Sequence, residues 1–121
     1  MKVLNHHIYE YKKGLRHLVL HTLDATLRFE AEARLHQRNI SYVVREVTAT
    51  KINIFFGDEK CVEVIREIGN KKLNEFTPEE DFMLGIMLGY DGLKQCERFL
   101  NLKRRKNDYL WKQIINTAIP A

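Results

Sequence analysis

Histidines are the residues of this chain best suited to binding a metal ion. His17 and His21 lie four positions apart, which on a helix would place two ligands on one face. On a strand the two rings would share a face about 13 Å apart, too far for one ion. A structural zinc needs four donors, and His6, His7 and His36 would complete a set only by an accident of folding. We therefore expect exposed or interfacial histidines and no metal site.

The two cysteines, Cys61 and Cys96, could support redox chemistry, but they form no Cys-x-x-Cys motif. Each falls on the apolar stripe of an expected helix, where a free cysteine usually packs as a small hydrophobic residue. A reactive thiol needs exposure and a positive neighbour. The adjacent Lys60 and Lys94 would point to other sides of their helices. Packing is the favoured interpretation, and a paired redox role would require the two helices to meet at these cysteines.

An acidic run, Glu79-Glu80-Asp81, follows Thr77-Pro78. This pattern predicts a helix start with a capping box, and the helix dipole stabilises acidic side chains in a first turn. Capping therefore explains the run without catalysis. The sequence contains no Ser/His/Asp order, phosphate-binding loop or Gly-x-Gly-x-x-Gly motif. We expect no catalytic residues and no cofactor, and an enzyme is the weakest class.

The net charge of +4 comes entirely from the end of the chain. Residues 1–100 contain 15 basic and 15 acidic residues, whereas the last 21 residues contain five basic residues and one acid, Asp108. Four of the five are consecutive: Lys103, Arg104, Arg105 and Lys106. The run is expected to end a helix, where cations complement the dipole, and a tail helix can then start at Asp108.

This basic run could bind an acidic protein or nucleic acid, or could simply be solvated. Opposite charges steer association between proteins. Nucleic-acid binding usually uses a wider basic surface with aromatic stacking, and the neutral remainder of the chain argues against it. Composition is that of a soluble globular protein, with 45% hydrophobic and 30% charged residues. Without a signal peptide or an apolar run of about 20 residues, a cytoplasmic protein with reduced thiols is expected.

The expected elements define an α+β fold. Residues 6–13 predict a helix capped by Asn5, residues 26–38 a second helix, and residues 40–47 and 50–56 a β-hairpin. A helix follows Gly57-Asp58, with an apolar stripe at Cys61, Val64, Ile65 and Ile68. Residues 15–23 fit either a helix or a strand. The strand is favoured because a hairpin alone is marginal, and it should lie beside residues 50–56.

The resulting prediction is a single domain over residues 1–121. It contains a three-stranded sheet in a β-α-β-β-α unit, which is partly ferredoxin-like, with added C-terminal helices. One sheet face would carry His17, Val19 and His21 with Asn53 and Phe55, or else the alternate residues, and the sequence does not fix which set faces outward. If both helices of the unit cover one face, helices 77–104 or a second subunit must cover the other.

The glycines of residues 79–100 predict closely packed helices. Gly85 costs a helix about 1 kcal/mol relative to alanine, and a close contact with a second helix would compensate. Gly89 fits a helix end and Asp91-Gly92 a turn. Leu93, Cys96, Phe99 and Leu100 would form the apolar face of the next helix.

Four segments resemble a known family: residues 79–90, Gln95-Cys96, residues 53–57 and residues 6–10. The chain is similar to the bacterial domain of unknown function two-thousand-and-twenty-three over residues 5–104, and residues 105–121 form a tail. The resemblance implies a compact α+β fold and a homodimer, and brings no established catalytic residues. It also associates such proteins with flavodoxins, which are acidic electron carriers. The expected function is binding or regulation, with an acidic partner such as flavodoxin docking on the basic run. A nucleic-acid binder and a redox or metal-dependent enzyme are the alternatives.

Overall fold

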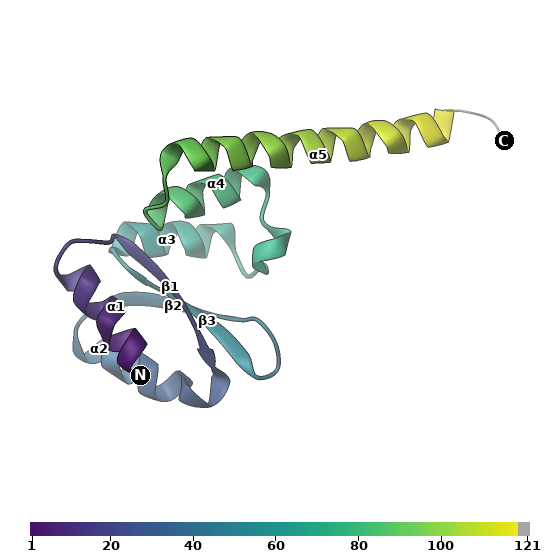
Figure 1. Ribbon diagram of the computed structural model, residues 1–121. Coiled ribbons are helices and arrows are strands. Elements are labelled where there is room, and N and C mark those ends of the chain that lie inside the picture. Colours follow the sequence, from purple (N-terminus) through teal and green to yellow (C-terminus); the bar gives the residue numbers. More distant parts are fainter. Residues whose placement is uncertain (119–121) are drawn as a thin grey trace.

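The computed structural model describes the backbone of residues 1–118 and the side chains of residues 1–110. A three-stranded sheet lies between two layers of helices, and a long helix extends beyond them (Figure 1). In chain order the elements are α1 (Lys2–Lys12), β1 (Leu18–Asp24), the 3₁₀ turn η1 (Ala25–Leu27), α2 (Arg28–Gln37), β2 (Ser41–Glu46), β3 (Lys51–Gly57), α3 (Glu59–Ile68), the 3₁₀ turn η2 (Leu73–Glu75), α4 (Pro78–Met87) and α5 (Gly92–Ala118). The predicted α+β class, with a three-stranded sheet and C-terminal helices, is confirmed.

The strand β3 occupies the centre of the sheet, between β1 and β2, and pairs antiparallel with both. The strand interpretation of residues 15–23 is therefore confirmed, although β1 begins only at Leu18 and Leu15 is exposed. Its predicted neighbour was also correct, since Val19 pairs with Phe56 and Thr22 with Asn53. The helix α2 carries the chain from β1 over β3 to β2, as a crossover connection requires.

Both faces of the sheet are covered by helices of the same chain. On one face, residues such as Ile54 and Phe56 pack with Leu4 and Ile8 of α1 and Leu35 of α2. On the other face, Leu18 and Phe55 pack with Val62 and Ile65 of α3, with Leu84 of α4 and with Leu88 at its C-terminal cap. The apolar run of β3 is buried on both sides for this reason.

The position of α3 departs from a ferredoxin-like arrangement, in which both helices of the unit would lie on one face. Here α2 and α3 cover opposite faces, because Leu18, Leu20 and Phe55 point away from α2 and need apolar cover. Val62 and Ile65 of α3 supply it. The predicted stripe on this helix was partly wrong, since Val62 is fully buried and Val64 is only half-buried.

The N-terminal helix begins earlier than expected. We predicted Asn5 as its cap, but α1 starts at Lys2 with Met1 in the cap position. Leu4 and Ile8 are one turn apart and both are buried, which favours extending the helix to include them. Asn5 instead accepts a hydrogen bond from Nη1 of Arg34, 2.7 Å away on α2. This contact joins the two helices of one layer.

The helices α4 and α5 pack as closely as the glycines predicted. A Cβ atom at Gly85 would lie 2.0 Å from Oε1 of Gln95, so only glycine fits this contact without a shift. Gly89 follows α4 with a φ of 83°, a left-handed conformation that favours glycine at a helix end. The Thr77/Glu80 capping box is present at the start of α4.

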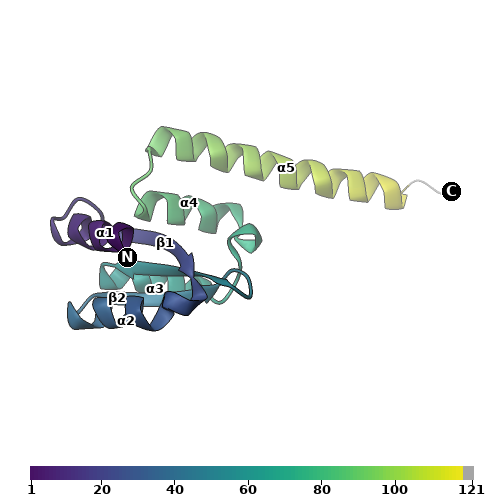
Figure 2. The same cartoon turned by 60° about the horizontal axis from the view of Figure 1, so that its bottom comes forward.

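The final helix is longer than predicted. We expected one helix to end at Lys103–Lys106 and another to start at Asp108, but α5 continues unbroken from Gly92 to Ala118. Residues 103–108 contain no glycine or proline, and lysine and arginine are good helix formers. The C-terminal part of α5 runs past the first turn of α4 and away from the sheet (Figures 1 and 2). No helix within the described part of the chain is long and apolar enough to cross a membrane.

Candidate binding surfaces

The predicted sheet-face residues lie in different places. His21 is on the α1 side of the sheet, opposite Ile54, whereas Asn53 and Phe55 are on the α3 side. Phe55 is buried in the core. His17 precedes β1, and its Nδ1 lies 2.6 Å from Oδ2 of Asp58. The four residues therefore do not form one surface.

Three of the histidines, His6, His7 and His21, lie close together through contacts between their rings. The rings of His7 and His21 are edge to face, with 5.4 Å between their centroids, and His6 adjoins His7. Burial lowers the pKa of His21, and the nearby His7 adds to the effect. His36 is on the exposed side of α2. Within residues whose side chains are described, no group of three or more histidine, cysteine or acidic side chains is arranged to hold a metal ion.

The cysteines occupy two different apolar environments, and both are free thiols. Cys61 is half-buried on α3 and packs at the margin of the core. Burial raises the pKa of its thiol, and the charge of Asp58 adds to the effect, so the reactive thiolate is disfavoured. Cys96 is exposed on α5, in an apolar groove shared with Phe82, Met83 and Phe99.

Each of the acidic residues at the start of α4 forms an ion pair outside that helix, two of them with α5 and one with the loop before α4. Oε1 of Glu79 accepts a hydrogen bond from Nζ of Lys103, and Oε1 of Glu80 accepts one from Nζ of Lys71. These bonds lower the pKa of both carboxyl groups. Asp81 binds Arg98 with both oxygens, at 2.7 and 2.9 Å. The acids therefore fasten α5 and the preceding loop to α4, beyond the capping role that we predicted.

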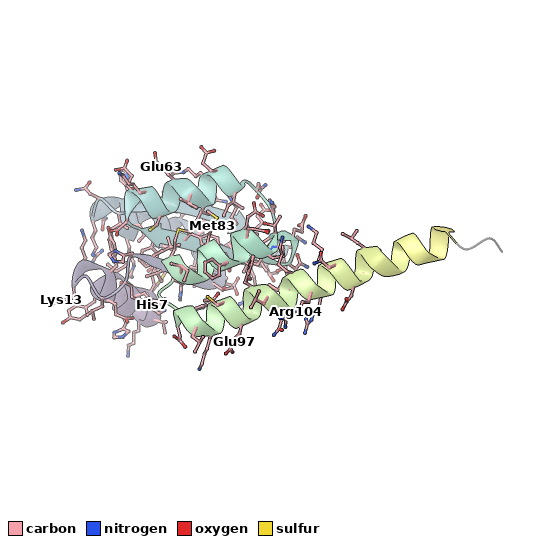
Figure 3. The ribbon with its side chains drawn as sticks, turned by 90° about the horizontal axis from the view of Figure 1, so that it is seen from above. His7, Lys13, Glu63, Met83, Glu97 and Arg104 are labelled. Carbon is pink, nitrogen blue, oxygen red and sulfur yellow. The ribbon has the colours of Figure 1, made fainter. Side chains whose placement is uncertain are left out.

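The predicted basic run, Lys103, Arg104, Arg105 and Lys106, forms a belt around α5. Successive helical residues point about 100° apart, so four of them face all sides of the helix. Lys103 is held by Glu79 and lies 5.9 Å from the centre of the Phe99 ring. Arg104, Arg105 and Lys106 are exposed. Arg104 lies where α5 leaves the remainder of the molecule, at the opposite end from Lys13 (Figure 3).

A row of polar side chains crosses the sheet on its α3 side, a feature that we did not predict from the sequence. Thr22 of β1, Asn53 of β3 and Arg45 of β2 are directly paired across the strands. Oγ1 of Thr22 donates a hydrogen bond to Oδ1 of Asn53 at 2.6 Å. The available signal was Asn53 itself, a polar residue inside the apolar run Ile52–Phe56. Its partners could not be identified without the register.

The fold and these surfaces define a small α+β protein with an ion-paired helical layer and a projecting basic helix. The family described as protein of unknown function (DUF2023) matches residues 2–103, and the chain belongs to this family. The resemblance found in the sequence is thereby confirmed. The matched span ends at Lys103, so Arg104, Arg105 and Lys106 lie just beyond it. A comparison with curated proteins finds no match.

Proposed function

We propose that this protein is a cytosolic binding or regulatory protein that docks an acidic protein on the basic belt of α5. The observation that supports this proposal is the exposure of Arg104, Arg105 and Lys106 where α5 projects from the other helices (Figure 3). The first 100 residues sum to zero charge, so the excess positive charge of the chain is concentrated here.

Charge on a projecting helix suits recognition of a charged surface. Opposite-charge surfaces raise encounter rates and set orientation more than they add affinity. Exposed charges are screened by salt over a Debye length of about 8 Å at physiological ionic strength. Docking on the belt should therefore be strong at low salt and weak at high salt. Flavodoxin is the first candidate partner, through the association that the family resemblance carries.

The test is a titration of the protein against flavodoxin at low and high salt. The informative variant changes Arg104, Arg105 and Lys106 to serine and keeps Lys103, because the Lys103–Glu79 pair holds α5 on α4. A matched control changes three exposed lysines elsewhere, Lys2, Lys13 and Lys60, and alters the net charge equally.

We expect wild type and control to bind at low salt and the belt variant to bind at least about tenfold more weakly, as expected when several interface charges are lost. Equal weakening in control and belt variant would mean that only net charge matters. Absence of wild-type binding at low salt would refute docking to flavodoxin. A single-stranded oligonucleotide titrated in parallel tests the nucleic-acid alternative, and tighter binding of the oligonucleotide would favour it.

We also propose that the protein is a homodimer through α5. Both sheet faces are covered by helices of the same chain, so a second copy has no open sheet face to cover. The exposed apolar residues of α5 remain as a surface that a second copy could bury. Leu93, Leu100 and Leu110 are exposed along α5. Leu93 and Leu100 are seven residues apart, close to two helical turns, so they lie on the same side of the helix. Leu110 is ten residues further on and is turned by about 80° from Leu100, which is the spacing of an a and a d position in a coiled-coil seam.

A further inference from the structure

The polar row on the α3 side of the sheet opens into a pocket that the proposed function does not use. The pocket has a volume of about 320 Å³, which is in the range of small-molecule sites. It lies between the end of the β2–β3 hairpin and the turn η2. The lining residues are Arg45, Glu46, Val47, Asn53, Phe55, Lys71, Lys72, Leu73 and Asn74.

Hydrogen-bond donors predominate in this pocket. Asn53 is 7% exposed, and its carbonyl oxygen is already occupied by the hydroxyl of Thr22 on β1. The register places Thr22 and Arg45 on opposite sides of Asn53, so its amide nitrogen is left for the Arg45 side and the pocket. Arginine and lysine side chains only donate. Because neighbouring donors cannot satisfy one another, these side chains favour a ligand that supplies an acceptor.

Arg45 has no anionic partner among the side chains of residues 1–110. Its Nε is buried and makes no hydrogen bond with any described residue. Nη1 donates only to the neighbouring carbonyl oxygen of Val44, at 3.3 Å. A buried donor on a charged group is costly to leave unpaired, so such a group in a native protein calls for a partner. Arg45 lines the pocket, so an acceptor bound there would supply the partner that its guanidinium lacks among residues 1–110.

The charges of the lining favour an anion. Arg45, Lys71 and Lys72 contribute three positive charges, and Glu46 contributes one negative charge. Lys71 is also paired with Glu80. Neither Arg45 nor Lys72 forms an ion pair with an acid in the described part of the chain. Phe55, Val47 and Leu73 add apolar walls, so an organic body can accompany the anionic group.

We propose that this pocket binds a small organic anion bearing a phosphate or carboxylate group. The acidic group accepts hydrogen bonds from Arg45 and from the amide nitrogen of Asn53, with Lys72 at the rim. The apolar body of the ligand rests against Phe55 and Leu73. This site is on the sheet and is independent of docking on α5.

The test follows ¹⁵N-labelled protein by NMR at constant ionic strength. Phenyl phosphate and benzoate carry the two acidic groups on the same flat body, and benzamide is the uncharged control. We expect saturable shifts of the Arg45 Nε–H signal and of the backbone amides of Arg45, Asn53 and Lys72 with at least one of the anions. The stronger anion identifies the preferred acidic group. Equal shifts with benzamide, or no saturation with either anion, would refute the site.

Variants distinguish anion binding in the pocket from a general effect of the charge of the protein. Arg45→Met removes the charged donors but keeps the apolar stem, and it should weaken the preferred anion at least about tenfold, the usual scale of a charge-assisted hydrogen bond. Lys72→Ser changes an exposed rim residue without touching the core, so it remains informative if Arg45→Met does not fold. Arg104→Ser is the matched control on α5 and should leave binding unchanged. Equal weakening by Lys72→Ser and Arg104→Ser would overturn the proposal.

Discussion

His21 is a titratable residue whose environment predicts a measurable pH effect. Its ring faces α1 and meets the ring of His7. Burial lowers the pKa of His21 below its usual 6.5, and the charges of His7 and the N-terminal amine add to this. The unfolded chain therefore binds this proton more readily than the folded chain does. The stability contributed by His21 is complete above about pH 6.5 and is lost as the pH falls through the lower folded value.

We predict that the free energy of unfolding of the wild-type protein falls between about pH 7 and pH 5, partly through His21. His21→Gln removes the titration, so its decline over the same range should be shallower. Urea unfolding at several pH values measures this decline. His36→Gln, at an exposed position on α2, is the control and should decline like wild type. Parallel curves for wild type and His21→Gln would contradict the prediction.

At the scale of elements, the close approach of α4 and α5 requires glycine at position 85, because a Cβ atom there would clash with Gln95. A Cβ at Gly85 would lie 2.4 Å from Cδ of Gln95, which is 8% exposed, so the side chain of Gln95 would have to move. Gly85→Ala gains about 1 kcal/mol of helix propensity. Overpacking costs about 1–3 kcal/mol. We therefore expect a net loss of stability of up to about 2 kcal/mol, measured by urea unfolding.

Two further variants locate the cause of this loss. Gly92→Ala introduces the same methyl group at the start of α5, where nothing lies within 4 Å. It should change stability by less than about 0.5 kcal/mol. In a Gln95→Ala background the clashing atoms are gone, so Gly85→Ala should become neutral or stabilising. A single Gly85→Ala variant that is about 1 kcal/mol more stable than wild type would show that the helices accept the methyl group at no cost.

The sequence predicted elements best where two signals agreed. Residues 15–23 were ambiguous by periodicity, but the marginal hairpin needed a third strand, and β1 is that strand. The start of α4 was predicted because Thr77, Pro78 and Glu80 all indicate it. The continuity of α5 was missed because a basic run is compatible with both the end and the middle of a helix.

The candidate sites were less predictable because their contacts join distant parts of the chain. Arg98 binds Asp81 and Lys103 binds Glu79, over 17 and 24 residues, and no local pattern indicates either pair. The pocket depends on the register that places Arg45 beside Asn53. A shift of one residue would have moved Arg45 to the other face of the sheet.

At the scale of the whole molecule, the projecting half of α5 needs an explanation. Isolated helices shorter than about 12–15 residues are marginal in water, and the part of α5 after Lys103 runs beyond the first turn of α4 (Figure 1). Leu110 is 48% exposed in this part of α5, and Leu100, ten residues earlier on the same helix, is also 48% exposed. A second copy of α5 laid along these residues would bury them and stabilise the helix.

We therefore predict a dimer at micromolar concentration, with twice the mass of the chain by light scattering. Leu100→Glu combined with Leu110→Glu places charges in the proposed interface and should give a monomer that remains folded, because neither residue belongs to the core. Leu15→Glu, on the exposed loop before β1, is the control and should remain dimeric. A monomeric wild-type protein would refute the dimer. A dimeric double variant would instead place the interface away from α5, since a charge at each apolar contact of a helix pair opposes association.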